Sequence, residues 1–331
     1  MSELGDMLRR RLAGVQPDAA WAALVEAGVP GICVPEALGG LGLTVGDAAP
    51  VLDALGELGL STPFLETSIL APLLTDAGDL LRDIASGSFV AIAGLERSLR
   101  GGVTATPTAN GWRLDGEAKL VLDGGSAAHV LVVARTEAGT PALLRVRNGQ
   151  PGLTARTYPT IDDREAADLL FVGVEASLLT ADATDSLELA EDTAIAGIAV
   201  EAAALMRRLV ERTREHLGER QQFGQPIGKF QVLQHRLVDM QIECRRAAAI
   251  AARAVEALPG HWRERGRLAS AAKVTISETA RFVGQNAVQL HGAMGMTREL
   301  DVGRYFRRLT VIEGQLGTAA QHRARFARLA A

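Results

Sequence analysis

The hydrophobic and polar positions divide the chain into three regions of different periodicity. The first, about 1–86, is rich in alanine and leucine and contains helical patches, which predicts an N-terminal helical domain. A glycine-rich turn at 35–43 interrupts the helices, and Asp47 is expected to cap the helix that follows it. The helices are predicted over 3–13, 17–27, 46–58 and 67–83.

The second region, about 87–182, contains short apolar runs separated by turn residues. Hairpin-type turn signals occur at 108–111, which includes Asn110, and at 114–116. These features predict a small antiparallel β domain. Its strands are expected at Phe89–Leu95, Gly111–Leu114, His129–Ala134, Pro141–Val146 and Leu169–Val172.

The third region, about 183–331, is predicted to be a C-terminal helical bundle. One apolar stripe runs Ile198, Ala202, Leu205 and Leu209, a second begins at Phe230, and a third helix is expected over 261–290. The order helices, β domain, helices gives an α+β fold class. It lacks the βαβ alternation and the GxGxxG string of a dinucleotide-binding fold.

Composition excludes several classes of function. The 331 residues are 47% hydrophobic and 22% charged, with a formal net charge of −4, which does not fit a nucleic-acid footprint. Cys33 and Cys244 support neither a disulfide framework nor a metal site, and both are interpreted as buried small hydrophobes. No apolar run of membrane-spanning length occurs, so a soluble, cytoplasmic protein is expected.

Four sequence strings together resemble the acyl-CoA dehydrogenase family. The densest is Arg220-Gln-Gln-Phe-Gly-Gln-Pro-Ile227 with its continuation to Met240, which is similar to the family pattern RxxFGxPIxxFQxxQHxLADM. Gln289-Leu-His-Gly-Ala-Met-Gly295, with Glu299 and Arg304, is similar to QxxGGxG…E…R. The turn at 31–43 and the segment 84–87 add two weaker matches, so the resemblance spans nearly the whole chain.

The resemblance implies the cofactor FAD and a cofactor contact made across a dimer interface. An arginine can donate a charge-assisted fork to phosphate oxygens, an aromatic ring can pack on flavin or adenine, and glutamine amides can bind phosphate, ribose or base. A glycine lets backbone approach a ligand. The residues expected to contact FAD, mostly that of a neighbouring subunit, are Arg220, Gln222, Phe223, Phe230, Gln231, Gln289, Gly292 and Ala293. His235 and His291 are interpreted as hydrogen-bonding structural residues.

The same resemblance shows where the catalytic base is missing. The family removes the α-proton of an acyl-CoA with a carboxylate nine residues after the arginine of an RD pair, or with one on the first bundle helix. Arg307-Arg308 matches that pair, and the two base positions fall on Leu316 and Ala194, neither of which can accept a proton. Glu313, three residues before Leu316, is the one alternative carboxylate considered there.

The segments that would hold the flavin ring are altered as well. Gly94–Gly102 replaces the family's TEPxAGSD loop, and 118–125 replaces its KxWITNG strand, with Leu120 and Leu122 at the tryptophan and threonine positions. The losses all concern the reactive ring and its base, whereas the residues that reach a neighbour's FAD remain.

The interpretation is a catalytically incomplete subunit. It resembles the short subunits of heteromeric actinobacterial acyl-CoA dehydrogenases, which act on steroid CoA thioesters as α2β2 heterotetramers. That resemblance implies a homologous full-length partner subunit, an acyl-CoA bound mainly in the partner, and an electron-transfer flavoprotein as acceptor. Two alternatives stay open: a self-sufficient homotetrameric dehydrogenase with Glu313 as base, and a structural scaffold that contacts no cofactor. No metal is expected.

Overall fold

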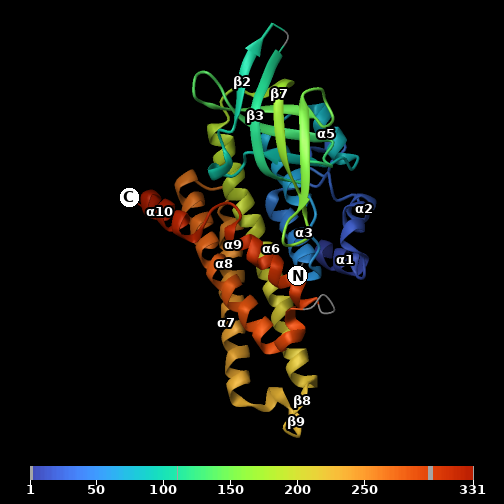
Figure 1. Ribbon diagram of the computed structural model, residues 1–331, viewed down its shortest axis with the longest axis vertical. Helices are drawn as coiled ribbons and strands as arrows, with labels where there is room; N and C mark the ends of the chain where they lie inside the picture. Colours follow the sequence, from blue (N-terminus) through green and yellow to red (C-terminus); the bar gives the residue numbers. More distant parts are fainter. Residues whose placement is uncertain (1–2, 110, 297–300, 331) are drawn as a thin grey trace. The chain divides into compact units, whose positions relative to one another are not determined.

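The computed structural model describes residues 3–109, 111–296 and 301–330 (Figure 1). Asn110 and Glu299 therefore lie outside the described residues. Internal contacts divide the chain into two compact units, one made of Met1–Ala13, Ala49–Leu60 and Ile195–Ala331, the other of Gly14–Ala48 and Ser61–Ala194. Along the chain, helices are followed by a sheet and then by helices, which confirms the predicted fold class. The domain boundaries near 86 and 182 stay predictions.

The N-terminal helices follow the predicted pattern with one break. They are α1 (Glu3–Leu12), α2 (Ala20–Glu26), α3 (Val45–Leu58), α4 (Ala71–Leu74) and α5 (Gly78–Ala85). The single helix predicted over 67–83 is wrong. A π-helical turn at Leu65–Leu70 runs into α4, and Thr75 then adopts an extended conformation, with its hydroxyl accepting a hydrogen bond from the Ala77 N–H at 3.1 Å. This local side-chain bond competes with the helix.

The cap of α3 also differs from the prediction. Thr44, not Asp47, precedes the helix, and its hydroxyl accepts the Asp47 N–H at 3.3 Å. The Asp47 carboxylate in turn accepts the Thr44 N–H at 3.0 Å, which forms a reciprocal capping box. The Thr44 hydroxyl also donates to the Asp47 carboxylate at 2.6 Å, and this bond, together with the one from the Thr44 N–H, holds the pKa of Asp47 below its usual value.

The described strands form a seven-stranded sheet with mixed pairing. Its order is β1-β4-β2-β3-β7-β5, β6 pairs with β7, and β5 also pairs with β4, so five of the strands close into a ring. Strands β1 and β2 both run parallel to β4, so the prediction of a purely antiparallel domain is wrong. The strands are β1 (Val90–Ala93), β2 (Val103–Thr108), β3 (Gly111–Leu122), β4 (His129–Arg135), β5 (Pro141–Arg147), β6 (Leu153–Pro159) and β7 (Glu165–Thr180).

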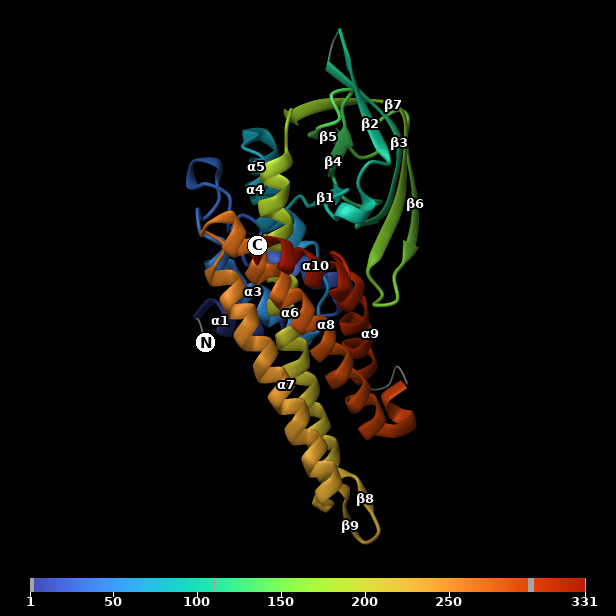
Figure 2. The same ribbon diagram turned by 90° about the vertical axis from the view of Figure 1, so that its left-hand side faces the viewer.

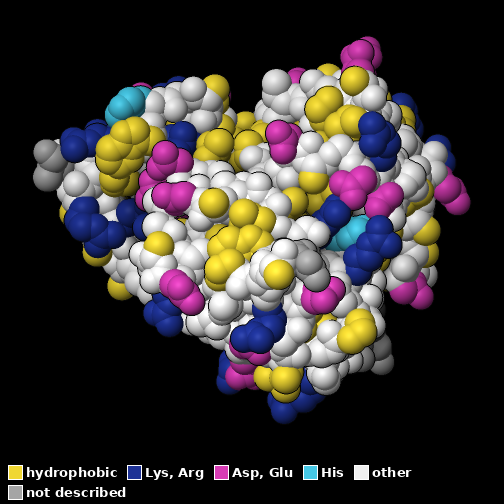
Figure 3. All heavy atoms as spheres, turned by 90° about the horizontal axis from the view of Figure 1, so that it is seen from above, with side chains coloured by type: hydrophobic (Ala, Val, Ile, Leu, Met, Phe, Trp, Pro, Cys, Tyr) yellow, Lys and Arg dark blue, Asp and Glu magenta, His cyan; other side chains and the backbone are white. Residues whose placement is uncertain are grey.

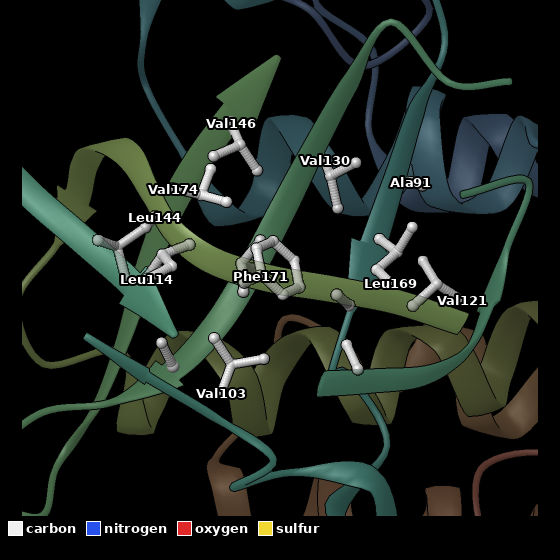
Figure 4. Packing of buried hydrophobic residues seen from close by; sticks show 14 of the residues in the cluster. Ala91, Val103, Leu114, Val121, Val130, Leu144, Val146, Leu169, Phe171 and Val174 are labelled. Atoms are coloured by element: carbon white, nitrogen blue, oxygen red, sulfur yellow. The ribbon is translucent and has the colours of Figure 1, made fainter. Parts of the chain in front are cut away.

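The core of this sheet forms around Phe171 of β7 (Figure 4). Leu114 of β3, Val130 of β4 and Leu144 of β5 are also fully buried. Each such side chain stabilises the fold by about 1.5–3 kcal/mol relative to exposure. The alternation of buried and exposed positions along β7 therefore fixes the register of the neighbouring strands.

The C-terminal part is helical, and its long helices carry the predicted stripes. These helices are α6 (Thr184–Glu219), α7 (Gln231–Glu256), α8 (Trp262–His291), α9 (Val302–Gly314) and α10 (Ala319–Ala330). Ile198, Ala202, Leu205 and Leu209 of α6 are buried as predicted. Helices α7 and α8 pack side by side (Figures 1 and 2). A small hairpin, β8 (Gln221–Gln222) with β9 (Gln225–Pro226), joins α6 to α7.

One face of α7 carries an exposed apolar stripe. Val232, Val238 and Ile242 are exposed, and His235 lies at the same helical spacing between them. His235 makes no hydrogen bond to another described residue, so its interpretation as a hydrogen-bonding structural residue stays a prediction. A row of apolar side chains exposed to water on one face of a helix is typical of an interaction surface.

The remaining surface features add little. On the face drawn in Figure 3, acidic and basic side chains are interspersed rather than gathered by sign. Cys244 is buried as predicted, whereas Cys33 is only half-buried; burial raises the pKa of Cys33 to about 12 and that of Cys244 to about 11. Among the described residues, no helix is both long and apolar enough to cross a bilayer, and no cluster of metal-binding side chains occurs.

Candidate cofactor-contact site

The β8–β9 hairpin positions the first group of predicted cofactor contacts. Its two-residue turn is Phe223-Gly224, and both residues have positive φ, +54° and +77°, as a type I′ turn requires. The hairpin is closed by the Ile227 N–H, which donates to the Arg220 carbonyl at 2.9 Å. It is tied to α6 by the Arg220 N–H, which donates to the His216 carbonyl at 2.9 Å. The loop geometry is therefore well defined.

Phe223 is an unusual residue for the tip of such a turn. Its side chain is 88% exposed, and a left-handed conformation costs a non-glycine residue roughly 1–2 kcal/mol. The ring makes an edge-to-face contact with Phe230, with centroids 5.9 Å apart. An exposed aromatic ring on strained backbone is typical of a residue kept for binding.

The polar side chains around Phe223 point into solvent. Arg220, Gln222 and Gln231 are exposed, and their side chains make no hydrogen bond or ion pair with another described residue. Five guanidinium donors and two amide groups are thus available to a ligand from outside. Phe230 is half-buried at the start of α7.

The second group of predicted contacts lies where α8 ends. Gly292 follows the helix with φ +62° and ψ −145°, a conformation essentially confined to glycine, and nothing lies within 4 Å of the position a Cβ would take. Gln289 and Ala293 are exposed beside it. Gly295 packs so closely that a Cβ there would lie 3.1 Å from that of His291, which anchors the turn Gly292–Met296 to the helix end.

Two histidine rings connect the hairpin and the Gly292 turn. His216 in the last turn of α6 stacks on His291 at the end of α8, with ring centroids 4.4 Å apart and planes 24° apart. His291 is buried and its Nδ1 lies 2.8 Å from the Ala287 carbonyl, so its interpretation as a hydrogen-bonding structural residue is confirmed. Burial, together with His291 and Arg220, lowers the pKa of His216. Sequence periodicity gave no signal for this pair.

The first of the two base positions is filled by a methyl group. Ala194 of α6 is 1% exposed. Glu191, one turn earlier, is also buried, but its carboxylate is ion-paired: Arg97 Nε lies 2.5 Å from Glu191 Oε2 and Arg100 Nη2 lies 3.8 Å away. This carboxylate is therefore engaged by two guanidinium groups of its own chain.

These arginines also shape the loop that replaces TEPxAGSD. Arg100 folds back to donate to the Leu95 carbonyl at 2.7 Å and to the Gly94 carbonyl at 3.2 Å, and burial lowers its pKa. In the strand that replaces KxWITNG, Leu120 lies in a β-bulge with φ +51° and is exposed, whereas Leu122 is half-buried. Neither leucine offers a hydroxyl or an indole N–H.

The second base position is a leucine in the connection between α9 and α10. Leu316 is 6% exposed, and its carbonyl accepts a hydrogen bond from His322 Nε2 at 2.8 Å. Buried Lys273 holds the end of α9, because its ammonium donates to the Ile312 and Glu313 carbonyls at 2.8 Å each. The Glu313 carboxylate itself is directed to Arg281 of α8, at 3.2 Å from Nε, and this contact raises the pKa of Arg281.

The buried ion pair between Arg308 and Glu201 was not predicted from the sequence. Arg308 stands at the aspartate position of the family's RD pair, and its guanidinium binds Glu201 of α6 in a bidentate fork, at 2.6 and 2.7 Å. Both side chains are buried. An arginine in place of an aspartate within a buried helix is the signal that could have predicted a compensating carboxylate elsewhere.

Comparison with family models gives matches at both ends of the chain. Residues 195–330 match the model described as "Acyl-CoA dehydrogenase, C-terminal domain", and residues 6–80 match "Acyl-CoA dehydrogenase, N-terminal domain". Among curated proteins, acyl-CoA dehydrogenase IpdE2 of Mycobacterium tuberculosis is 30% identical over 87% of this chain and 79% of its own length.

Solved structures of two complexes resemble the whole chain. A variant of the Tcur3481–Tcur3483 steroid ACAD is 29% identical with a TM-score of 0.89, covering 99% of this chain and 96% of that one. The ChsE4–ChsE5 complex from Mycobacterium tuberculosis is 25% identical with a TM-score of 0.91, covering 99% and 97%.

Proposed function

Because this chain belongs to the acyl-CoA dehydrogenase family, we propose that it is the helper subunit of a heteromeric FAD-dependent enzyme. In this proposal it completes the FAD site of a homologous full-length partner and does not supply the catalytic base. One observation carries the proposal: the predicted cofactor contacts lie at the surface of one subunit, while alanine and leucine fill the two base positions.

The residues present fit an FAD molecule held by another subunit. Arg220 can bind the diphosphate through its unengaged fork, and Phe223 offers a free ring face to flavin or adenine. Gln222, Gln231 and Gln289 add amide groups, while Gly292 and Ala293 leave room for the ligand to approach the backbone. FAD, when bound, accepts the hydride that leaves the β-carbon of the thioester.

The protein's own side chains then bind and orient but do not take a proton. Ala194 and Leu316 carry no basic atom, Glu191 is ion-paired with Arg97, and Glu313 faces Arg281. The partner therefore supplies the carboxylate that removes the α-proton. The same partner holds most of the acyl-CoA, and an electron-transfer flavoprotein takes the electrons onward.

The names of the two related structures support a partner subunit and a class of substrate for this chain. The Tcur3481–Tcur3483 protein is named a steroid ACAD, and ChsE4–ChsE5 is named a complex. We propose by analogy a CoA thioester of steroid origin and an α2β2 assembly. The exposed stripe Val232, Val238 and Ile242 on α7 supports such an assembly, because an apolar row of this kind is stabilised by burial against another subunit.

The test is to count flavins. The chain is purified alone and together with a homologous full-length acyl-CoA dehydrogenase subunit, and FAD is measured by absorbance for each protein chain. We expect no bound flavin and no acyl-CoA oxidation for the chain alone, and both in the mixed complex. Stoichiometric FAD with turnover from the chain alone would refute the proposal, and a partner that holds FAD equally well without this chain would favour a scaffold.

A further inference from the structure

The stacked histidine pair lies between the two segments to which the proposed function assigns the FAD contacts. His216 is one helical turn before Arg220, and its carbonyl accepts the Arg220 N–H at 2.9 Å. His291 directly precedes Gly292, and the turn at Gly295 packs on its Cβ. The ring contact, with centroids 4.4 Å apart, therefore joins the end of α6 to the end of α8 at the point where both cofactor-contacting segments begin.

We propose that His216 and His291 form a positioning pair that holds the hairpin and the Gly292 turn in register for FAD, and that protonation of His216 loosens this hold. The inference rests on the proposed function. Neither ring is assigned a contact with FAD or substrate. Each acts through the backbone that it anchors.

The charges around His216 explain why the neutral stack is the stable form. His291 faces it from α8, Arg220 from the hairpin, and Glu219 from its own helix. Partial burial disfavours the charged form of the His216 ring, and His291 and Arg220 also oppose a positive charge on it. The contact of His291 Nδ1 with the Ala287 carbonyl, at 2.8 Å, fixes the orientation of the ring on which His216 stacks.

The sign of the pH effect follows from the lowered pKa of His216 in the fold. An unfolded histidine takes up a proton near pH 6.5. Below that pH the unfolded chain binds more protons than the folded one, so the neutral stack is fully formed above about pH 6.5 and is lost as the pH falls through the lower folded value. FAD retention should weaken over the same range.

The experiment compares ring replacement with ring removal in the assembled complex. FAD retention is measured by flavin fluorescence after rapid desalting at pH 7.5 and at pH 5.5. His216→Phe keeps a stacked ring without a titrating group, and we expect wild-type retention at pH 7.5 and a flat pH profile. His216→Ala removes the stack, and we expect retention roughly 2- to 10-fold weaker at both pH values.

A control variant and a second measurement separate this inference from the proposed function. His261→Asn removes an exposed histidine at the start of α8 while keeping a capping side chain, and it should leave the pH profile unchanged. In the chain alone, hydrogen exchange of the Ile227 amide reports hairpin closure. We expect its protection, corrected for intrinsic rates, to fall about tenfold from pH 7.5 to 5.5 in the wild type but not in His216→Phe.

The outcomes are distinct. The positioning pair is overturned if FAD retention in His216→Phe falls with pH as steeply as in the wild type. It is also overturned if acidification tightens FAD retention. If Arg220→Ala leaves FAD retention unchanged, the proposed function fails, and the exchange measurement then decides whether the stack couples the two segments. Loss of exchange protection at the Ile227 amide at pH 5.5 in the wild type, but not in His216→Phe, supports the positioning pair.

Discussion

The hairpin at Arg220–Ile227 and the connection between α9 and α10 at Leu316 differ in their burial and in their hydrogen-bonding partners. The hairpin presents an arginine, glutamines and an 88% exposed phenylalanine on left-handed backbone, with no side-chain partner for Arg220 among the described residues. In the α9–α10 connection, Leu316 is buried, and Lys273 and His322 donate hydrogen bonds to the nearby carbonyls. An exposed aromatic ring on strained backbone indicates a binding role, whereas a buried leucine among hydrogen-bonded carbonyls indicates a structural one.

The largest expected effect tests whether the buried region serves stability. Glu201→Gln removes the carboxylate from a buried, bidentate guanidinium, and we expect the free energy of unfolding to fall by about 3–5 kcal/mol. Urea unfolding of the chain measures it. The matched control is Glu211→Gln on the same helix, which breaks an exposed pair with Arg208 and should cost less than about 1 kcal/mol. Equal effects would contradict a structural role for the buried pair.

The next effect tests the binding role of the hairpin. Arg220→Ala removes one charge-assisted contact, worth about 1.5–3 kcal/mol, so FAD in the mixed complex should be held roughly 10- to 150-fold more weakly. Equilibrium dialysis against FAD measures the affinity. Arg214→Ala, which changes an exposed arginine of α6, is the control and should leave the affinity unchanged. An unchanged affinity in Arg220→Ala would remove the hairpin from the cofactor site.

A smaller effect separates binding from stability within the hairpin. Phe223→Asn gives the Asn-Gly pair that type I′ turns favour, so we expect the free energy of unfolding to rise by about 0.5–1 kcal/mol while FAD retention falls. Phe223→Ala loses the ring but keeps a residue strained at positive φ. It should therefore weaken FAD without the gain in stability, and a stability gain without any loss of FAD would show that the ring is not a contact.

The smallest expected effect concerns Glu313. Because its carboxylate is directed to Arg281, Glu313→Gln in the mixed complex should change kcat by less than about twofold. Steady-state oxidation of an acyl-CoA with an artificial electron acceptor measures this. A drop of a hundredfold or more would identify Glu313 as the base and restore the self-sufficient homotetramer as the better hypothesis.

The features that the sequence could predict were local ones. The stripe Ile198, Ala202, Leu205 and Leu209 follows directly from helical spacing. Strand β6 was missed because its side chains are mostly exposed and give no alternation, and the break at Thr75 depends on a single side-chain bond. The parallel pairing of β1 with β4 is a property of topology that no short window contains.

The candidate site shows the same limit. The motif predicted which residues contact the cofactor, but neither the hairpin and the turn that carry them nor what connects these two segments. The His216–His291 stack joins two helix ends, and the Arg308–Glu201 fork joins residues 107 positions apart in sequence. Such pairings depend on how helices pack, so one sequence without structural information leaves them undetermined.

The exposed stripe Val232, Val238 and Ile242 on α7 has a consequence for the protein inside a cell. A newly made copy that has not met its counterpart shows an apolar row of the kind that chaperones and proteases recognise. We expect its abundance to follow the supply of the other subunit, so that deleting that subunit's gene shortens the half-life of this chain in a pulse-chase experiment without changing its messenger RNA.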